Sequence, residues 1–214
     1  MLKQIKAWFM GLSTPPHHLE KPSQMQVGDL MTLDDHFALP PELRGQSFRV
    51  KRISSYEYDY GIFPGFVMES AQRERVFLTV DEDDDITLEF SLKLSHKQVL
   101  ALFPEGTIAH ILSQEQTSVS IEPGKLAQSL QQWLSTDYER REKPYAFTYY
   151  GGQDARAEDF ARDYPEKGTS YFLHSRDKEK AIEMEDWGDG EVEVCVVLLV
   201  DPKHIKSLWV GDDT

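Results

Sequence analysis

The chain has 214 residues and carries 37 acidic against 23 basic side chains, which gives a formal net charge of −14. Hydrophobic residues make up 40% of the chain and charged residues 28%, a balance that excludes a disordered polymer and predicts one or two folded domains. Nucleic-acid binding depends on a positive surface, so this composition argues against a nucleic-acid partner.

Residues 1–12 predict a short amphipathic helix, and a proline-containing linker extends from it to residue 24. Two interpretations are open: the helix docks on its own domain, or its aromatic and basic residues make a peripheral membrane contact. No apolar run approaches the roughly 20 residues of a spanning helix, and no secretory signal is recognisable. We therefore expect a cytoplasmic protein.

Residues 25–104 predict a β-rich lobe. Residues 47–60 alternate between apolar and polar side chains, residues 66–68 predict a short strand, and strands at 76–80 and 86–94 are joined by an acidic segment. Ser95 is a plausible N-cap for a following helix that contains Val99, Leu100 and Phe103. The lobe is expected to be a small antiparallel sheet or half-open barrel.

Residues 105–214 predict an α+β lobe, which either stands alone or forms a single domain with residues 25–104. We expect extended structure at 107–121, then a helix that starts at Pro123 and buries Leu126, Leu130, Trp133 and Leu134. Strands are expected at 145–150, 168–172, 180–184 and 191–200, with a short helix at 154–162. The last strand should begin at a sheet edge and end in the core.

The whole pattern predicts an α+β fold that is mainly antiparallel sheet, in small barrel-like or sandwich-like lobes with two or three helices. Cys195, the only cysteine, lies in an apolar run and is expected to be a small buried hydrophobe.

An acidic run between two strands is the most conspicuous cluster. Asp81, Asp83 and Asp85 have the 1-3-5 spacing of a calcium loop, but Ile86 and Leu92 stand where that loop needs glycine and glutamate. The run therefore predicts a solvated hairpin tip, and we expect neither a metal site nor a cofactor.

Two aromatic runs of period two are the best candidate binding surface. Each run places its rings on one face of a strand, and two basic residues lie near the first. Either the rings pack across strands, or they form a protein- or ligand-binding face. The candidate binding residues are Tyr56, Tyr58, Tyr60, Tyr145, Phe147, Tyr149, Arg49 and Lys51.

Three segments within residues 25–95 resemble a small bacterial β domain of unknown function. They are Val27-Gly28-Asp29-Leu30, Ser47-Phe48-Arg49-Val50 and the strand from Arg75 to Glu82. Members of that family are encoded near phage-shock-like membrane-associated proteins and polyamine-synthesis enzymes. The resemblance implies a bacterial cytoplasmic accessory role, is compatible with a place near the membrane, and carries no catalytic residues.

Because no catalytic motif is recognisable, the sequence favours an accessory protein that acts by protein–protein interaction over an enzyme. The alternative is an enzyme of unknown class whose site assembles scattered residues in space. The candidates for such a site are Tyr171, His174, Asp177, His96, His110 and His204.

Overall fold

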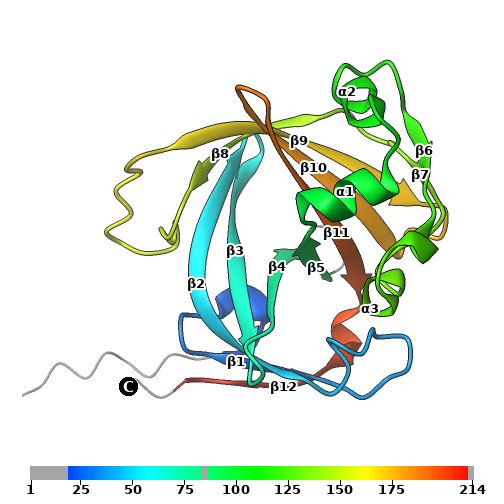
Figure 1. Ribbon diagram of the computed structural model, residues 1–214. Coiled ribbons are helices and arrows are strands. Elements are labelled where there is room, and N and C mark those ends of the chain that lie inside the picture. Colours follow the sequence, from blue (N-terminus) through cyan, green and yellow to red (C-terminus); the bar gives the residue numbers. More distant parts are fainter. Residues whose placement is uncertain (1–18, 83–85, 212–214) are drawn as a thin grey trace, which may run out of the picture.

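The computed structural model describes residues 19–82 and 86–211, and its dominant feature is a single antiparallel sheet (Figure 1). The helix expected at residues 1–12 lies outside the described residues. The strands are β1 (Leu30–Leu33), β2 (Ser47–Tyr58), β3 (Gly61–Ser70), β4 (Arg75–Asp81), β5 (Thr87–Lys93), β6 (Ser118–Ser120), β7 (Asp137–Glu139), β8 (Tyr145–Tyr150), β9 (Glu166–Ser175), β10 (Lys180–Gly188), β11 (Glu191–Val200) and β12 (Ile205–Trp209). Mainly antiparallel β structure is thus confirmed.

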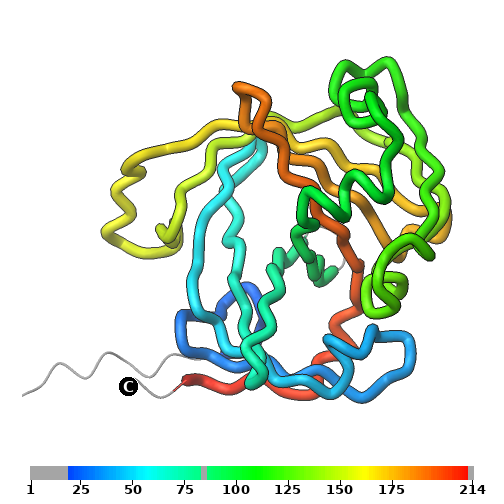
Figure 2. Tube along the Cα trace, viewed as in Figure 1, coloured from blue at the N-terminus to red at the C-terminus, as the bar shows by residue number. Residues whose placement is uncertain are grey.

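Eight of these strands close into a barrel. Around the ring the order is β2, β3, β4, β5, β11, β10, β9 and β8, and β8 closes it by pairing with both β9 and β2. β8 and β2 are far apart in the chain but lie side by side in space (Figure 2). The pairings of β5 with β11 and of β2 with β8 join residues 25–104 to residues 105–214 in one sheet.

The two faces of the barrel strands have different environments. Side chains on one face, such as Phe48, Phe66 and Phe90, are buried in the main apolar core. That core also takes in β1, the loop before β2 and the helical segment 95–134. Alternate side chains, such as Ser54 and Glu89, turn instead into a cavity. A register shift between Val50 and Arg52 changes which residues of β2 face inward.

Three short α-helices lie together on one side of the molecule (Figure 1). They are α1 (His96–Leu102), α2 (Thr107–Leu112) and α3 (Gln128–Gln131), and 3-10 turns occupy η1 (Pro22–Gln24), η2 (Pro123–Lys125) and η3 (Pro202–His204). The expected helix after Ser95 is confirmed as α1, with Ser95 at its N-cap. At this start the Gln98 side chain accepts a hydrogen bond of 2.7 Å from the Ser95 backbone N–H.

The sequence predictions between residues 105 and 162 were partly wrong. Residues 107–112 form α2 rather than a strand, since Gly106 adopts a φ of +80° that turns the chain into the helix. The long helix expected from Pro123 is broken into η2 and α3, although Trp133 is fully buried and donates to Glu42. Residues 154–162 form turns rather than a helix.

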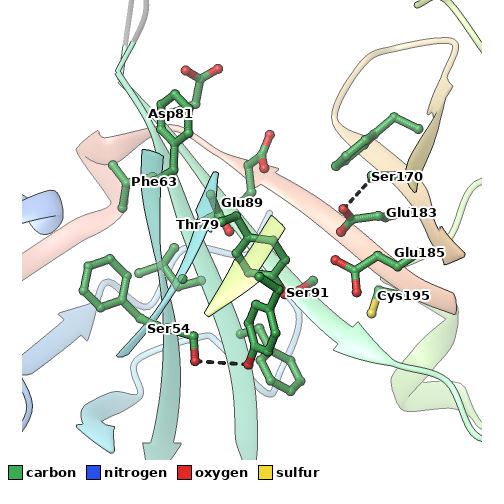
Figure 3. A pocket seen from close by; sticks show the side chains of 18 of the residues that line it. Ser54, Phe63, Thr79, Asp81, Glu89, Ser91, Ser170, Glu183, Glu185 and Cys195 are labelled. Carbon is green, nitrogen blue, oxygen red and sulfur yellow. Dashed lines mark hydrogen bonds between the residues drawn. The ribbon is translucent and has the colours of Figure 1, made fainter. Parts of the chain in front are cut away.

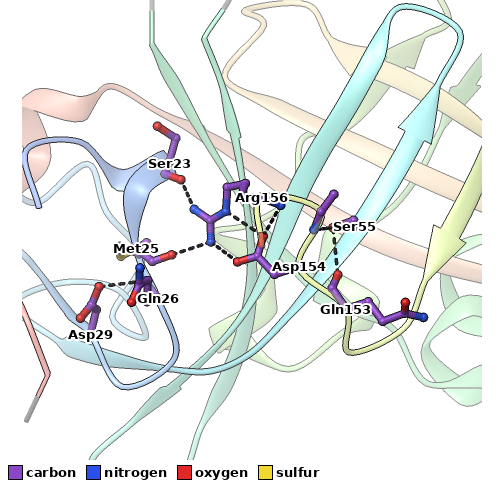
Figure 4. A network of polar contacts seen from close by, with 9 residues as sticks. Ser23, Met25, Gln26, Asp29, Ser55, Gln153, Asp154 and Arg156 are labelled. Atoms are coloured by element: carbon purple, nitrogen blue, oxygen red, sulfur yellow. Dashed lines mark hydrogen bonds and ion pairs between the residues drawn. The ribbon is translucent and has the colours of Figure 1, made fainter. Parts of the chain in front are cut away.

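The 154–162 segment is held by Arg156 (Figure 4). Its guanidinium donates to the carbonyl oxygens of Ser23 and Met25 and forms two bonds, of 2.8 and 2.7 Å, to the Asp154 carboxylate. The same group lies 5.4 Å from the ring centroid of Phe66. One side chain thus ties the loop after β8 to the segment before β1, a geometry that only the planar arginine fork can make.

We expect Arg156→Ala to lower the free energy of unfolding by about 2 kcal/mol, because two carbonyls and a carboxylate lose a charged donor. Arg156→Lys should recover less than half of the loss, since a single ammonium nitrogen cannot reach the acceptors that three separate guanidinium nitrogens contact. Urea unfolding checks both variants, with exposed Arg176→Ala as the control. Equal stability of the alanine variant and the control would contradict this role.

Candidate functional site

The barrel encloses a cavity of about 520 Å³, within the usual range for small-molecule sites. An eight-stranded barrel is just wide enough to hold one small ligand when its interior is not filled by side chains. Here every barrel strand contributes to the lining. The cavity is therefore the candidate site, and its chemistry differs from one side to the other.

One side of the cavity is an aromatic wall built by the adjacent strands β8, β2 and β3. The Tyr56 ring centroid lies 4.9 Å from that of Tyr149 and 5.4 Å from that of Phe147. Tyr58 stacks on Tyr60 at 5.3 Å with an interplanar angle of 14°. These contacts fix the rings against one another, so the wall is a preformed apolar surface.

Two glycines make room for that wall. A Cβ at Gly168 would lie 2.5 Å from the Phe147 ring and 3.0 Å from the carbonyl oxygen of Asp186. A Cβ at Gly65 would lie 3.1 Å from the Tyr56 ring. Both positions sit in strands, where glycine is intrinsically unfavourable, and here the close approach of a ring accounts for it.

Across the barrel lies an acidic wall built by the adjacent strands β5, β11 and β10. It carries Glu89, Glu193, Glu183 and Glu185. Glu183 and Glu185 alternate along β10 and point away from the strand into the cavity, and Glu89 projects from β5 (Figure 3). Glu185 lies directly opposite Glu193 in the register of β10 and β11. Like charges thus converge in a partly enclosed space.

This crowding perturbs the carboxyl groups. Burial, followed by the charges of Glu183, Asp81 and Glu142, raises the pKa of Glu89 from 4.5 to about 8. Burial also raises the pKa values of Glu183 and Glu185, and for Glu185 the charge of Glu183 adds to the effect. Some of these three carboxyl groups therefore stay protonated near neutral pH, because they cannot all ionise in the cavity without a compensating cation.

Two other acidic groups of the cavity already have basic partners. Lys93 forms an ion pair with Glu193, and His174 lies 2.6 Å from Glu142. The hydrogen bond from His174 lowers the pKa of Glu142. Within the part of the chain that the structure describes, Glu89, Glu183 and Glu185 have no ion-pair partner, and Glu183 accepts a hydrogen bond of 2.9 Å from Ser170. Among the described residues, no ion pair supplies the positive charge that these three carboxylates require.

The structure separates the predicted binding residues into two groups. Five tyrosines, namely Tyr56, Tyr58, Tyr60, Tyr145 and Tyr149, line the cavity, and Phe147 packs among them. Arg49 lies elsewhere and donates to the carbonyl oxygen of Gly28 over 2.7 Å. Lys51 is exposed outside the cavity. Neither basic residue lines the cavity with the aromatic rings: Arg49 precedes the register shift in β2, and Lys51 lies within it.

The residues of the alternative enzyme site are not brought together. His174 lines the cavity, whereas Tyr171 is buried in the apolar core. Asp177 accepts a hydrogen bond from Ser175 in the turn after β9. His204 lies 3.1 Å from Asp34 near β1, and His96 and His110 are exposed on α1 and α2.

The sequence reasoning missed the acidic wall. A signal was present, because Glu183 and Glu185 in β10 and Glu191 and Glu193 in β11 occupy alternate positions. Such alternation ordinarily marks a solvent-facing side. The prediction that β11 starts at a sheet edge agrees with its pairing, because Glu191, Val192 and Glu193 pair with β10 alone and β5 joins only from Cys195 onward. Glu193 nevertheless faces the cavity. Cys195 likewise faces the cavity rather than the apolar core (Figure 3).

No family model, curated protein or solved structure matches the chain. Residues 19–82 and 86–211 contain no group of three or more histidine, cysteine, aspartate or glutamate side chains arranged to hold a metal ion.

The same part of the chain contains no helix that is both long and apolar enough to span a lipid bilayer.

Proposed function

We propose that the protein binds a small organic ammonium ion inside the barrel. The observation that supports the proposal is the opposition of two walls: three carboxylates without a basic partner face a surface of fixed tyrosine and phenylalanine rings. Ammonium groups are attracted both to carboxylates and to the faces of aromatic rings. The alkyl part of such a ligand gains from contact with the same rings.

Charge and size together favour an organic cation over other ligands. An anion would meet Glu89, Glu183 and Glu185 with only Arg52, Lys93 and His174 to oppose them. A neutral apolar ligand would leave the carboxyl groups buried without compensation. A bare inorganic cation would make no use of the rings in a cavity of about 520 Å³.

The test compares hexan-1-amine, which is cationic at pH 7.5, with hexan-1-ol, which has the same chain without the charge. Binding is measured by thermal shift and by intrinsic fluorescence, in 150 mM salt at about neutral pH, because screening suppresses adsorption to the acidic surface. We expect the amine to bind and the alcohol not to bind. Equal binding of the two, or binding of neither, would contradict the proposal.

We propose a protein partner as a second function, as expected of an accessory protein. The exposed end of β12 supports it: Trp209 is 63% exposed and lies opposite Leu30 of β1, the one strand with which β12 pairs among the described residues. Strand edges with exposed aromatic residues are suited to pairing with another chain. A protein that co-purifies with the wild-type chain but not with Trp209→Lys would support this function. Equal recovery of the same proteins by both chains would oppose it.

A further inference from the structure

We infer that the ligand is an extended amine with at least two ammonium groups, because three carboxylates without ion-pair partners are distributed over one wall of the cavity. The inference rests on the proposed binding of an organic ammonium ion. It adds the charge and the shape that the ligand must have.

The acidic wall carries more carboxylates than one ammonium group can neutralise. Glu89, Glu183 and Glu185 all face the cavity and form no ion pair among the described residues, whereas Glu193 and Glu142 pair with Lys93 and His174. A single ammonium group would leave at least two of the three carboxyls protonated or unpaired. Buried carboxylates without a partner are costly, so a ligand with several positive charges matches the wall better.

The three carboxylates have different charged neighbours. Glu89 interacts electrostatically with Asp81 and Glu142, whereas Glu185 interacts with Glu193 and Lys93. Glu183 interacts with both Glu89 and Glu185. Glu183 and Glu185 lie two residues apart on β10, and Glu89 projects from β5 (Figure 3), so a ligand that neutralises all three must present its charges at separate points.

The third argument is the shape of the cavity. Its lining extends along β2 from Arg52 to Tyr58, six residue steps. At about 3.3 Å per residue and a strand tilt of about 40°, this is about 15 Å along the barrel axis. This length accommodates a methylene chain that joins two ammonium groups, and the aromatic wall would contact such a chain.

The test is a ligand series of constant chain chemistry and increasing charge: hexan-1-amine, 1,6-diaminohexane and the triamine spermidine. Dissociation constants are measured by calorimetry on the full chain in 150 mM salt. We expect 1,6-diaminohexane to bind at least tenfold more tightly than hexan-1-amine, and spermidine at least as tightly as the diamine. Magnesium ions serve as a compact divalent control and should not compete.

The matched variants are Glu183→Gln in the cavity and Glu105→Gln on the exposed surface after α1. Glu183→Gln should remove most of the advantage of the diamine over the monoamine, and Glu105→Gln should leave it unchanged. Equal affinities for monoamine and diamine would overturn this inference and leave the binding of ammonium ions intact. Failure of all three amines to bind would overturn both the binding of ammonium ions and the requirement for two ammonium groups. Competition by magnesium would show that the diamine only screens the acidic surface, and would overturn the inference.

Discussion

The unliganded protein is expected to lose about 4 kcal/mol of its free energy of unfolding between pH 5 and pH 9 through Glu89 alone. The pKa of this carboxyl is raised from 4.5 to about 8 in the folded chain. Between those two values the folded state holds a proton that the unfolded state has released. Stability is therefore fully present below the lower value and falls as the pH rises towards the upper one.

Thermal unfolding of wild type and Glu89→Gln at pH 5, 7 and 9 measures this effect. A loss of about 4 kcal/mol lowers the melting temperature by about 12 °C in a chain of this size. Glutamine cannot ionise, so the variant should be the more stable protein at pH 9 and should match wild type closely at pH 5. The control Glu105→Gln should follow wild type throughout. Parallel pH profiles for wild type and Glu89→Gln would contradict the account of the acidic wall.

The second large effect concerns affinity. The double variant Glu183→Gln/Glu185→Gln should bind 1,6-diaminohexane about a hundredfold more weakly than wild type, since each charge-assisted contact contributes about 1.5 kcal/mol. Both substitutions keep the size of the side chain and remove carboxyls whose pKa values burial raises, so the variant should fold at least as stably as wild type.

Calorimetry on the folded double variant separates binding from stability. The exposed-surface variant Glu105→Gln again serves as the control, because it changes the net charge by one without touching the cavity. Wild-type affinity in the double variant would show that the amine binds outside the barrel, and would remove the acidic wall from the account.

Much of the fold was predictable because local patterns determine it. Two apolar-rich runs on either side of an acidic segment predict the pair of strands β4 and β5, and Ser95 predicts the start of α1. Barrel closure was not predictable. The pairing of β8 with both β2 and β9 joins strands that are about a hundred residues apart in one case, and no local pattern encodes such a contact.

The candidate site was half visible in the sequence. The tyrosine runs were recognised because aromatic residues at period two are unusual. The acidic wall was missed because Glu183 and Glu185 have the alternation of a solvent-facing strand. Only the closed sheet shows that this polar face turns inward, where the same carboxylates acquire raised pKa values and face the rings across a cavity.

We expect a cationic ligand to replace the protons that neutralise the carboxyl groups of the acidic wall near neutral pH. Titration of wild type with 1,6-diaminohexane at pH 7.5, in two buffers of different ionisation enthalpy, tests it most directly. The account predicts binding with release of about one proton per ligand, because the ammonium groups lower the raised pKa values of the acidic wall. Absence of binding, or binding without proton release, would contradict it.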